Sequence, residues 1–232
     1  MPPPKPKRVE DGFLWRYQEQ SIEQALIQKL ARYISGLSAA HVLLTNGFVQ
    51  EQGVLERTLD ELNEDIIFLA GAILTANITA LHQKYLKAFY AEEFLTISDP
   101  VGSLNERYMT PRKKIRAYIS RTIGPGSDPS HHLAVLKTIS KVYSGFVHAA
   151  SPQIMDMCAG DPPIFHVSGM LGTPRIDESS YDIWNYFYRG LISVMFVGKA
   201  FGDSSLVDAL LKYSFDFQEA SRRDFGARRP ET

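Results

Sequence analysis

The sequence predicts an all-α protein, a bundle of about six or seven helices with one short irregular or hairpin-like insertion. Apolar residues recur at steps of three and four over most of the chain, which is typical of amphipathic helices. Alternating strand patterns are almost absent, and no internal repeat is evident. The 232 residues and the 44% hydrophobic content suit one domain with a sizeable core.

Glycine, proline and polar clusters separate the expected helices. The first two are joined by a very short connection, so we expect them to pack antiparallel as a hairpin. Proline just inside the start of the fourth favours helix initiation there. Helices are expected at Tyr17–Leu44, Gly47–Leu74, Ile78–Leu95, Pro111–Thr122, Ser130–Ala150, Tyr181–Phe201 and Ser204–Arg222, and the short segment Ser151–Cys158 permits one more helical start.

These boundaries give a single domain over residues 16–224. Within it we expect a loop at 98–110, a break at 123–129 and an irregular insertion at 160–177, because these segments are rich in proline, glycine and polar residues. The proline-rich residues 1–15 and the polar residues 225–232 are expected to be flexible tails.

Composition narrows the function classes. The formal net charge of −1 gives no global basic field, which argues against a DNA-coating role but leaves an RNA or protein partner open. The single cysteine, Cys158, suits a reducing cytoplasm and makes a structural zinc site improbable. We expect no metal or cofactor, because nucleotide-binding and metal motifs are missing. The most apolar run, Leu191–Val197, is shorter than the roughly 20 residues that cross a bilayer, so we expect a soluble protein without a membrane role.

The second expected helix carries one anomaly. Its leucine and isoleucine residues form a long apolar stripe, and Arg57, Glu61 and Glu64 gather on the opposite side. Glu51 projects within the stripe, about 20° from the direction of Leu62. One interpretation is a buried carboxylate that binds a His, Arg or Tyr of a facing helix. The other is a solvated carboxylate that the helix dipole favours.

The fourth expected helix is the one concentrated basic segment. Arg112, Lys113 and Arg116 lie on it together with Lys114 and Arg121. Such a face is either solvated or contacts phosphate or an acidic partner. For the second case we select Arg112, Lys113 and Arg116 as binding residues.

The helix at Ser130–Ala150 carries the candidate catalytic residues. Lys141, Ser144 and His148 lie at i, i+3 and i+7, away from the apolar stripe that includes Tyr143. If another helix or a second subunit covers this line, the cation, hydroxyl and imidazole could perform acid–base chemistry on a phosphodiester. The alternative is a polar helix face without chemistry.

Two stretches carry a family resemblance. LLTNGFVQEQGVLERTLDELNEDIIFL, followed much later by KVYSGFVHAAS, resembles a loosely defined set of bacterial all-helical domains. These are similar in turn to the higher-eukaryote and prokaryote nucleotide-binding (HEPN) bundles, which include metal-independent ribonucleases and non-catalytic RNA-binding proteins. The ribonuclease signature is an arginine a few residues before a histidine in a dimer cleft. Lys141 and His148 match these positions, but lysine lacks the planar fork of arginine.

Three functional hypotheses follow. The first is a homodimeric, non-catalytic or weakly catalytic HEPN-like binding module, with Glu51 and Tyr143 in a polar cleft shared with Lys141, Ser144 and His148. The second is a metal-independent ribonuclease in which His148 is the general base and Lys141 stabilises the phosphate. The third is a structural interaction protein that docks through the basic helix 111–122.

Overall fold

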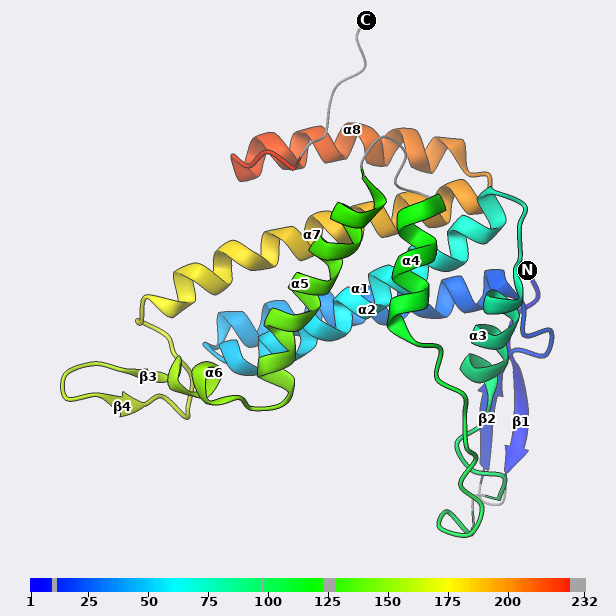
Figure 1. Ribbon diagram of the computed structural model, residues 1–232, viewed down its shortest axis with the longest axis horizontal. Helices are drawn as coiled ribbons and strands as arrows, with labels where there is room; N and C mark the ends of the chain where they lie inside the picture. Colours follow the sequence, from blue (N-terminus) through cyan, green and yellow to red (C-terminus); the bar gives the residue numbers. More distant parts are fainter. Residues whose placement is uncertain (10–11, 97, 123–127, 226–232) are drawn as a thin grey trace, which may run out of the picture.

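The computed structural model describes residues 1–9, 12–96, 98–122 and 128–225. Within these ranges the chain forms eight helices and two small antiparallel sheets, so the all-α prediction is confirmed (Figure 1). None of the described helices is long and apolar enough to cross a membrane. The elements are β1 Lys5–Val9, β2 Gly12–Arg16, α1 Ile22–Thr45, α2 Val49–Leu74, α3 Ala80–Tyr90, α4 Arg112–Thr122, α5 Pro129–Val147, α6 Ser151–Met155, β3 Cys158–Ala159, β4 Ile164–Phe165, α7 Arg175–Ala200 and α8 Ser204–Ser221.

Helix α2 occupies the centre of the bundle. It packs antiparallel against α1, as the short connection predicts, and also contacts α7, α5 and α4, whereas α8 lies along α7 (Figure 1). Gly47 makes the turn between α1 and α2 with φ of +81°, a conformation that favours glycine. The core around this pair contains fully buried aromatic and aliphatic side chains, among them Tyr33, Phe68 and Leu69.

Helix α5 approaches α2 very closely. A Cβ atom added to Gly53 of α2 would lie 2.7 Å from the ring of Phe146, so only glycine lets the two helices meet at this distance. Helix α4 packs beside α5 on the same side of α2. These two helices therefore place their side chains directly against the α2 surface.

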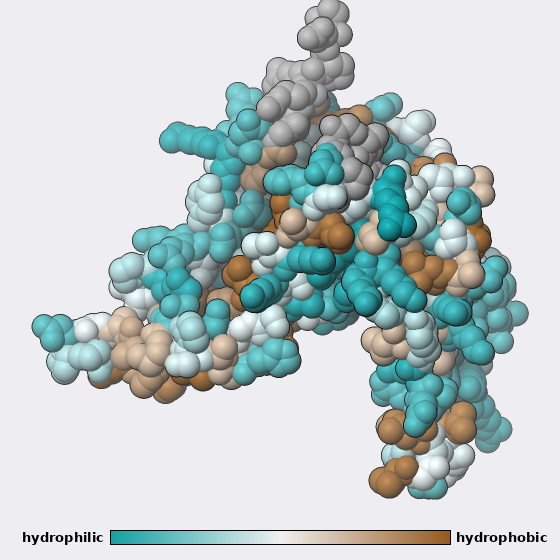
Figure 2. Space-filling view, in the orientation of Figure 1, coloured by the Kyte–Doolittle hydropathy of each residue, from teal (hydrophilic) through white to brown (hydrophobic). Residues whose placement is uncertain are grey.

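Two projections extend from the bundle. One consists of the β1–β2 hairpin and the loop after α3, in which Phe94 and Leu104 form a β-bridge. The other consists of α6 and the β3–β4 hairpin. Figure 2 shows a hollow underside between them, with exposed apolar side chains at the end of the first projection. That loop contributes Leu95, Val101 and Leu104, all largely exposed.

The segments between the predicted helices differ in detail from expectation. Residues 1–15 contain regular structure, because β1 and β2 pair from Lys5↔Arg16 to Val9↔Gly12. The insertion expected at 160–177 contains one strand of a hairpin that starts earlier, at Cys158, and α7 already begins at Arg175. Most of the break at 123–129 and nearly all of the tail at 225–232 lie outside the described residues.

Candidate functional site

Four buried carboxylates define the most polar part of the interior. Glu56, Asp60 and Glu64 recur at steps of four along α2, so they lie on one side of the helix, and Asp65 follows directly. We call these four residues the acidic face. A buried carboxylate is unfavourable unless it is paired or hydrogen-bonded. The residues that contact the acidic face therefore determine whether each of its carboxylates is neutralised or hydrogen-bonded.

Helix α4 neutralises the C-terminal half of the acidic face. Arg116 Nε donates to Glu64 Oε1 at 2.7 Å, and Arg112 Nη1 donates to Glu64 Oε2 at 3.3 Å. Arg112 also pairs with Asp65. Burial raises the pKa of the Glu64 carboxyl, and the arginines, Arg116 foremost, oppose that shift.

Helices α1 and α3 reach the same turn of α2. Lys29 Nζ lies 2.8 Å from Asp65 Oδ2, and the Tyr85 hydroxyl donates to that oxygen at 2.6 Å. The Lys29 ammonium also lies 5.0 Å from the ring centroid of Phe89, within cation–π range. Asp65 thus connects α1, α3 and α4 to α2.

Helix α7 neutralises the middle of the acidic face. Arg189 donates to Asp60 Oδ1, and the Tyr186 hydroxyl is 3.5 Å from Asp60 Oδ2. The buried Tyr33 of α1 donates its hydroxyl to the Tyr186 carbonyl at 2.8 Å. The three longest helices are therefore joined by polar contacts inside the core.

Glu56 is the one member of the acidic face without a basic partner among the described residues. It is 3% exposed and accepts a hydrogen bond from Gln52 Nε2 at 2.8 Å. Burial raises the pKa of the Glu56 carboxyl to about 8, and the nearby Asp182 and Asp60 act in the same direction. Tyr143 of α5, which donates to Asp182 at 3.4 Å, completes this group. Glu56 is therefore mostly protonated at neutral pH.

The acidic face joins other helices to α2. Its partners are fixed side chains of four other helices, and the three cavities described below are lined by other residues. Within the described ranges, no group of three or more His, Cys, Asp or Glu residues is arranged to hold a metal ion. The pairs therefore act by fixing α1, α3, α4 and α7 on α2.

The structure corrects the predictions for α2 and α4. Glu51 is exposed in the first turn of α2, so the buried-carboxylate interpretation is wrong for this residue. Glu64, expected on the outer face, is buried, whereas the expected Arg57–Glu61 pair is present at 2.7 Å. Arg112 and Arg116, expected on a binding surface, point inward to the acidic face, and Lys113 is exposed.

The predicted catalytic residues do not meet Glu51. Lys141 and His148 are exposed on α5, and Ser144 between them is half-buried. Among the described residues, no hydrogen bond or ion pair joins His148 to Glu51. Glu51 instead lines a cavity of about 10 Å³ beside His166, which holds no more than a single water.

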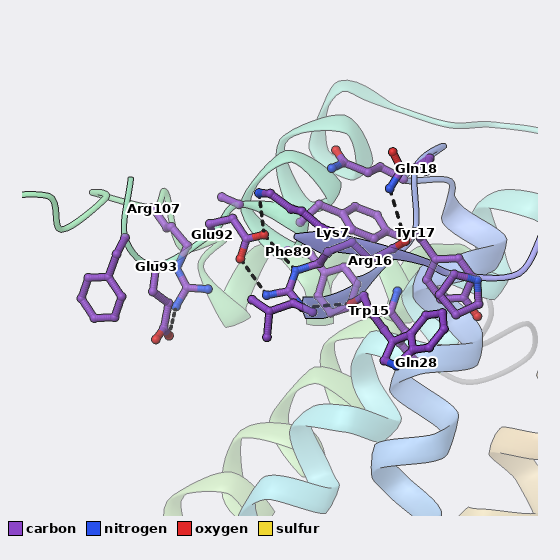
Figure 3. A pocket seen from close by; sticks show the side chains of 16 residues that line it. Lys7, Trp15, Arg16, Tyr17, Gln18, Gln28, Phe89, Glu92, Glu93 and Arg107 are labelled. Atoms are coloured by element: carbon purple, nitrogen blue, oxygen red, sulfur yellow. Dashed lines mark hydrogen bonds and ion pairs between the residues drawn. The ribbon is translucent and has the colours of Figure 1, made fainter. Parts of the chain in front are cut away.

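A larger site lies where the first projection joins the bundle. A groove of about 840 Å³ separates the β1–β2 hairpin from the C-terminal end of α3 (Figure 3). Its size falls in the range of ligand-binding pockets. Aromatic rings and carboxamides predominate in its lining, namely Trp15, Tyr17, Phe89, Tyr90, Phe94, Gln18, Gln20 and Gln28.

The charged residues of this groove are paired with one another. Arg16 binds Glu92 through two nitrogens at 2.8 and 2.9 Å, and Lys7 lies 3.5 Å from the same carboxylate (Figure 3). Arg107 binds Glu93 at 2.9 Å. The hydrogen bond from Arg16 lowers the pKa of the Glu92 carboxyl. The pairs of Lys7 and Arg16 with Glu92 hold the hairpin against the segment that follows α3. Among the described residues, every Lys, Arg, Asp and Glu of the lining takes part in an ion pair.

Comparisons with known proteins give no relative from which a function could be transferred. No family model matches the chain, and no match was found among curated proteins or solved structures. The functional interpretation therefore rests on the geometry described above.

Proposed function

We propose that the chain is a non-catalytic binding module that holds an extended peptide segment of a protein partner in the groove between the β1–β2 hairpin and α3. The observation that carries this proposal is the groove itself. It combines a volume of about 840 Å³ with aromatic walls, carboxamides and charges that are already paired. Aromatic surfaces bind apolar side chains, and carboxamides can both donate to and accept from a peptide backbone.

The electrostatics of the groove favour a peptide over a highly charged ligand. A polyanion would have to compete with Glu92 for Arg16 and with Glu93 for Arg107. The exposed Trp15 offers an aromatic anchor of the kind that dominates protein interfaces. The loop that follows α3 also exposes the apolar side chains of Leu95 and Val101.

Replacing Trp15 by alanine should weaken peptide binding at least about tenfold, because a central aromatic anchor typically supplies about 2 kcal/mol or more. Ligands would be selected from a phage-displayed library of random linear peptides on the wild-type protein and measured by fluorescence anisotropy. Tyr213→Ala is the matched control, since this ring is similarly exposed on α8. Failure to select any peptide, or equal affinity of Trp15→Ala, would contradict the proposal.

A second prediction concerns the ribonuclease hypothesis. Lys141 of α5 and His148 at the C-cap of that helix are seven positions apart, so about 10 Å of helix rise separates them, and both side chains are exposed. We expect total RNA incubated with the protein in EDTA to remain intact. Cleavage by the wild type that His148→Ala abolishes would contradict a non-catalytic role, whereas cleavage that survives the substitution would indicate a contaminant.

The finer parts of the initial hypothesis remain proposals. We propose that the bundle is HEPN-like, on the resemblance of the segments around Glu51 and His148, and that it is a homodimer in a bacterial cytoplasm. The single Cys158 supports a reducing compartment. Analytical ultracentrifugation of the purified chain would test the dimer directly.

A further inference from the structure

A second cavity separates α3 from α4, at a different place from the peptide groove. Its volume is about 470 Å³. Lys84 of α3 and Lys114 and Arg121 of α4 line it, and no carboxylate contributes to the lining. Within the described ranges, none of these three cations takes part in an ion pair. The basic residues of α4 thus have different surroundings: Arg112 and Arg116 neutralise buried carboxylates, whereas Lys114 and Arg121 line the cavity.

The rest of the lining is aromatic and apolar. Tyr118 forms one wall, and its ring is fixed edge-on against Phe68 and His82 at centroid distances of 5.1 and 4.7 Å. Its hydroxyl is buried and has no hydrogen-bond partner among the described residues. Tyr108 and Leu81 contribute further apolar surface. Because this hydroxyl is inaccessible, Tyr118 presents its ring to the cavity.

Three cations around one cavity repel one another, and an anion between them removes that repulsion. The dipole of α3, which begins at Ala80, favours an anion here, and that of α4, which ends at Thr122, opposes it. Because the two helix dipoles oppose each other, the charges of the side chains determine the preference of the cavity for an anion. A phosphate group presents several acceptor oxygens and two negative charges, which suits two ammonium groups and one guanidinium. The apolar wall suits a planar or hydrocarbon group attached to that phosphate.

We propose that the cavity between α3 and α4 binds a small organic phosphate, with the phosphate held by Lys84, Lys114 and Arg121 and the organic group against Tyr118. This site is independent of the peptide groove, because the two share no lining residue. The proposal can therefore hold or fail separately from the proposed function.

Isothermal titration calorimetry of the full chain at low ionic strength tests the site with three probes. Phenyl phosphate carries both the ring and the charge, inorganic phosphate lacks the ring, and phenol lacks the charge. We expect one phenyl phosphate per chain, bound at least about tenfold more tightly than inorganic phosphate, and no detectable phenol. Absence of phenyl phosphate binding at millimolar concentration would overturn the site. Equal affinity for inorganic phosphate would overturn the proposal that the organic group binds against Tyr118.

Matched double variants separate the cavity from general electrostatic attraction. Lys114→Ala with Arg121→Ala should weaken phenyl phosphate at least about tenfold. Lys113→Ala with Lys137→Ala removes the same charge from exposed positions outside the cavity and should leave the affinity within about twofold. Equal losses in both would overturn the site. Tyr118→Phe keeps the ring and removes only the inaccessible hydroxyl, so the affinity should stay within about twofold, and a tenfold loss would contradict contact through the ring alone.

Discussion

Replacing Arg116 by alanine should lower the free energy of unfolding by about 3 kcal/mol, because removal of one partner leaves a buried charge uncompensated. The side chains of Arg116 and Glu64 are 8% and 6% exposed, and their atoms lie 2.7 Å apart. Arg112 remains 3.3 Å from Glu64 but is shared with Asp65, so it compensates only in part. Urea denaturation followed by circular dichroism measures the difference.

Two further variants identify the cause. Lys113→Ala changes an exposed residue of the same helix and should stay within about 0.5 kcal/mol of the wild type. Replacing both Arg116 by methionine and Glu64 by leucine removes the buried charges together and should recover most of the loss. A change below about 1 kcal/mol in Arg116→Ala would show that this pair does not hold α4 on α2.

The second large effect is expected at Glu56 and depends on pH. The folded protein retains the Glu56 proton up to a pKa of about 8, whereas the unfolded chain releases it near 4.5. Between these values the folded state binds the extra proton, so its stability falls as pH rises, and below about 4.5 the two states are equally protonated. Glu56→Gln has no proton to lose and keeps an acceptor for Gln52. Its advantage over the wild type should therefore grow by on the order of 3 kcal/mol from pH 5 to pH 8.

Urea denaturation of both proteins at several pH values between 5 and 8 gives this difference. Asp60 and Asp182 also have raised pKa values, chiefly because of burial, so the wild-type curve alone contains their titration as well. Subtracting the Glu56→Gln curve isolates Glu56 to the extent that the groups are independent. Glu51→Gln controls for loss of a carboxylate from the exposed side of α2. A stability difference that does not change with pH would refute the shifted ionisation.

Hydrophobic periodicity predicted the helices well, but it could not identify the inner side of α2. An apolar stripe identifies the buried side of a helix that packs against one neighbour. Helix α2 instead contacts four helices, namely α1, α4, α5 and α7. The direction of the leucine side chains therefore placed Glu51 within the apolar stripe, although Glu51 lies in the first turn of α2 and is exposed. The residues that make Glu64 and Asp60 tolerable in the core are Arg116, 52 positions away, and Arg189, 129 positions away. A local sequence pattern does not reveal pairs between residues that are so far apart in the chain.

The groove was missed for a different reason. The prolines of the first residues suggested a tail, yet Pro6 lies in a two-stranded hairpin, where an edge strand tolerates a residue without an N–H. The sequence has an Asp-Gly pair ahead of the apolar and basic run Phe13–Arg16, and such a pair in a sequence is a strong hairpin signal. The hairpin could therefore have been predicted. Its position against α3 depends on Glu92, which local sequence does not reveal.

The chain order of the acidic face and its partners bears on synthesis. A nascent chain that ends before residue 175 contains α1 and α2 but lacks Arg189. Synthesis proceeds from the N-terminus, so Asp60 lacks its Arg189 partner until α7 leaves the ribosome. Burying the Asp60 carboxylate without that partner would be unfavourable. Full burial of this part of α2 therefore becomes favourable only once α7 has been synthesised.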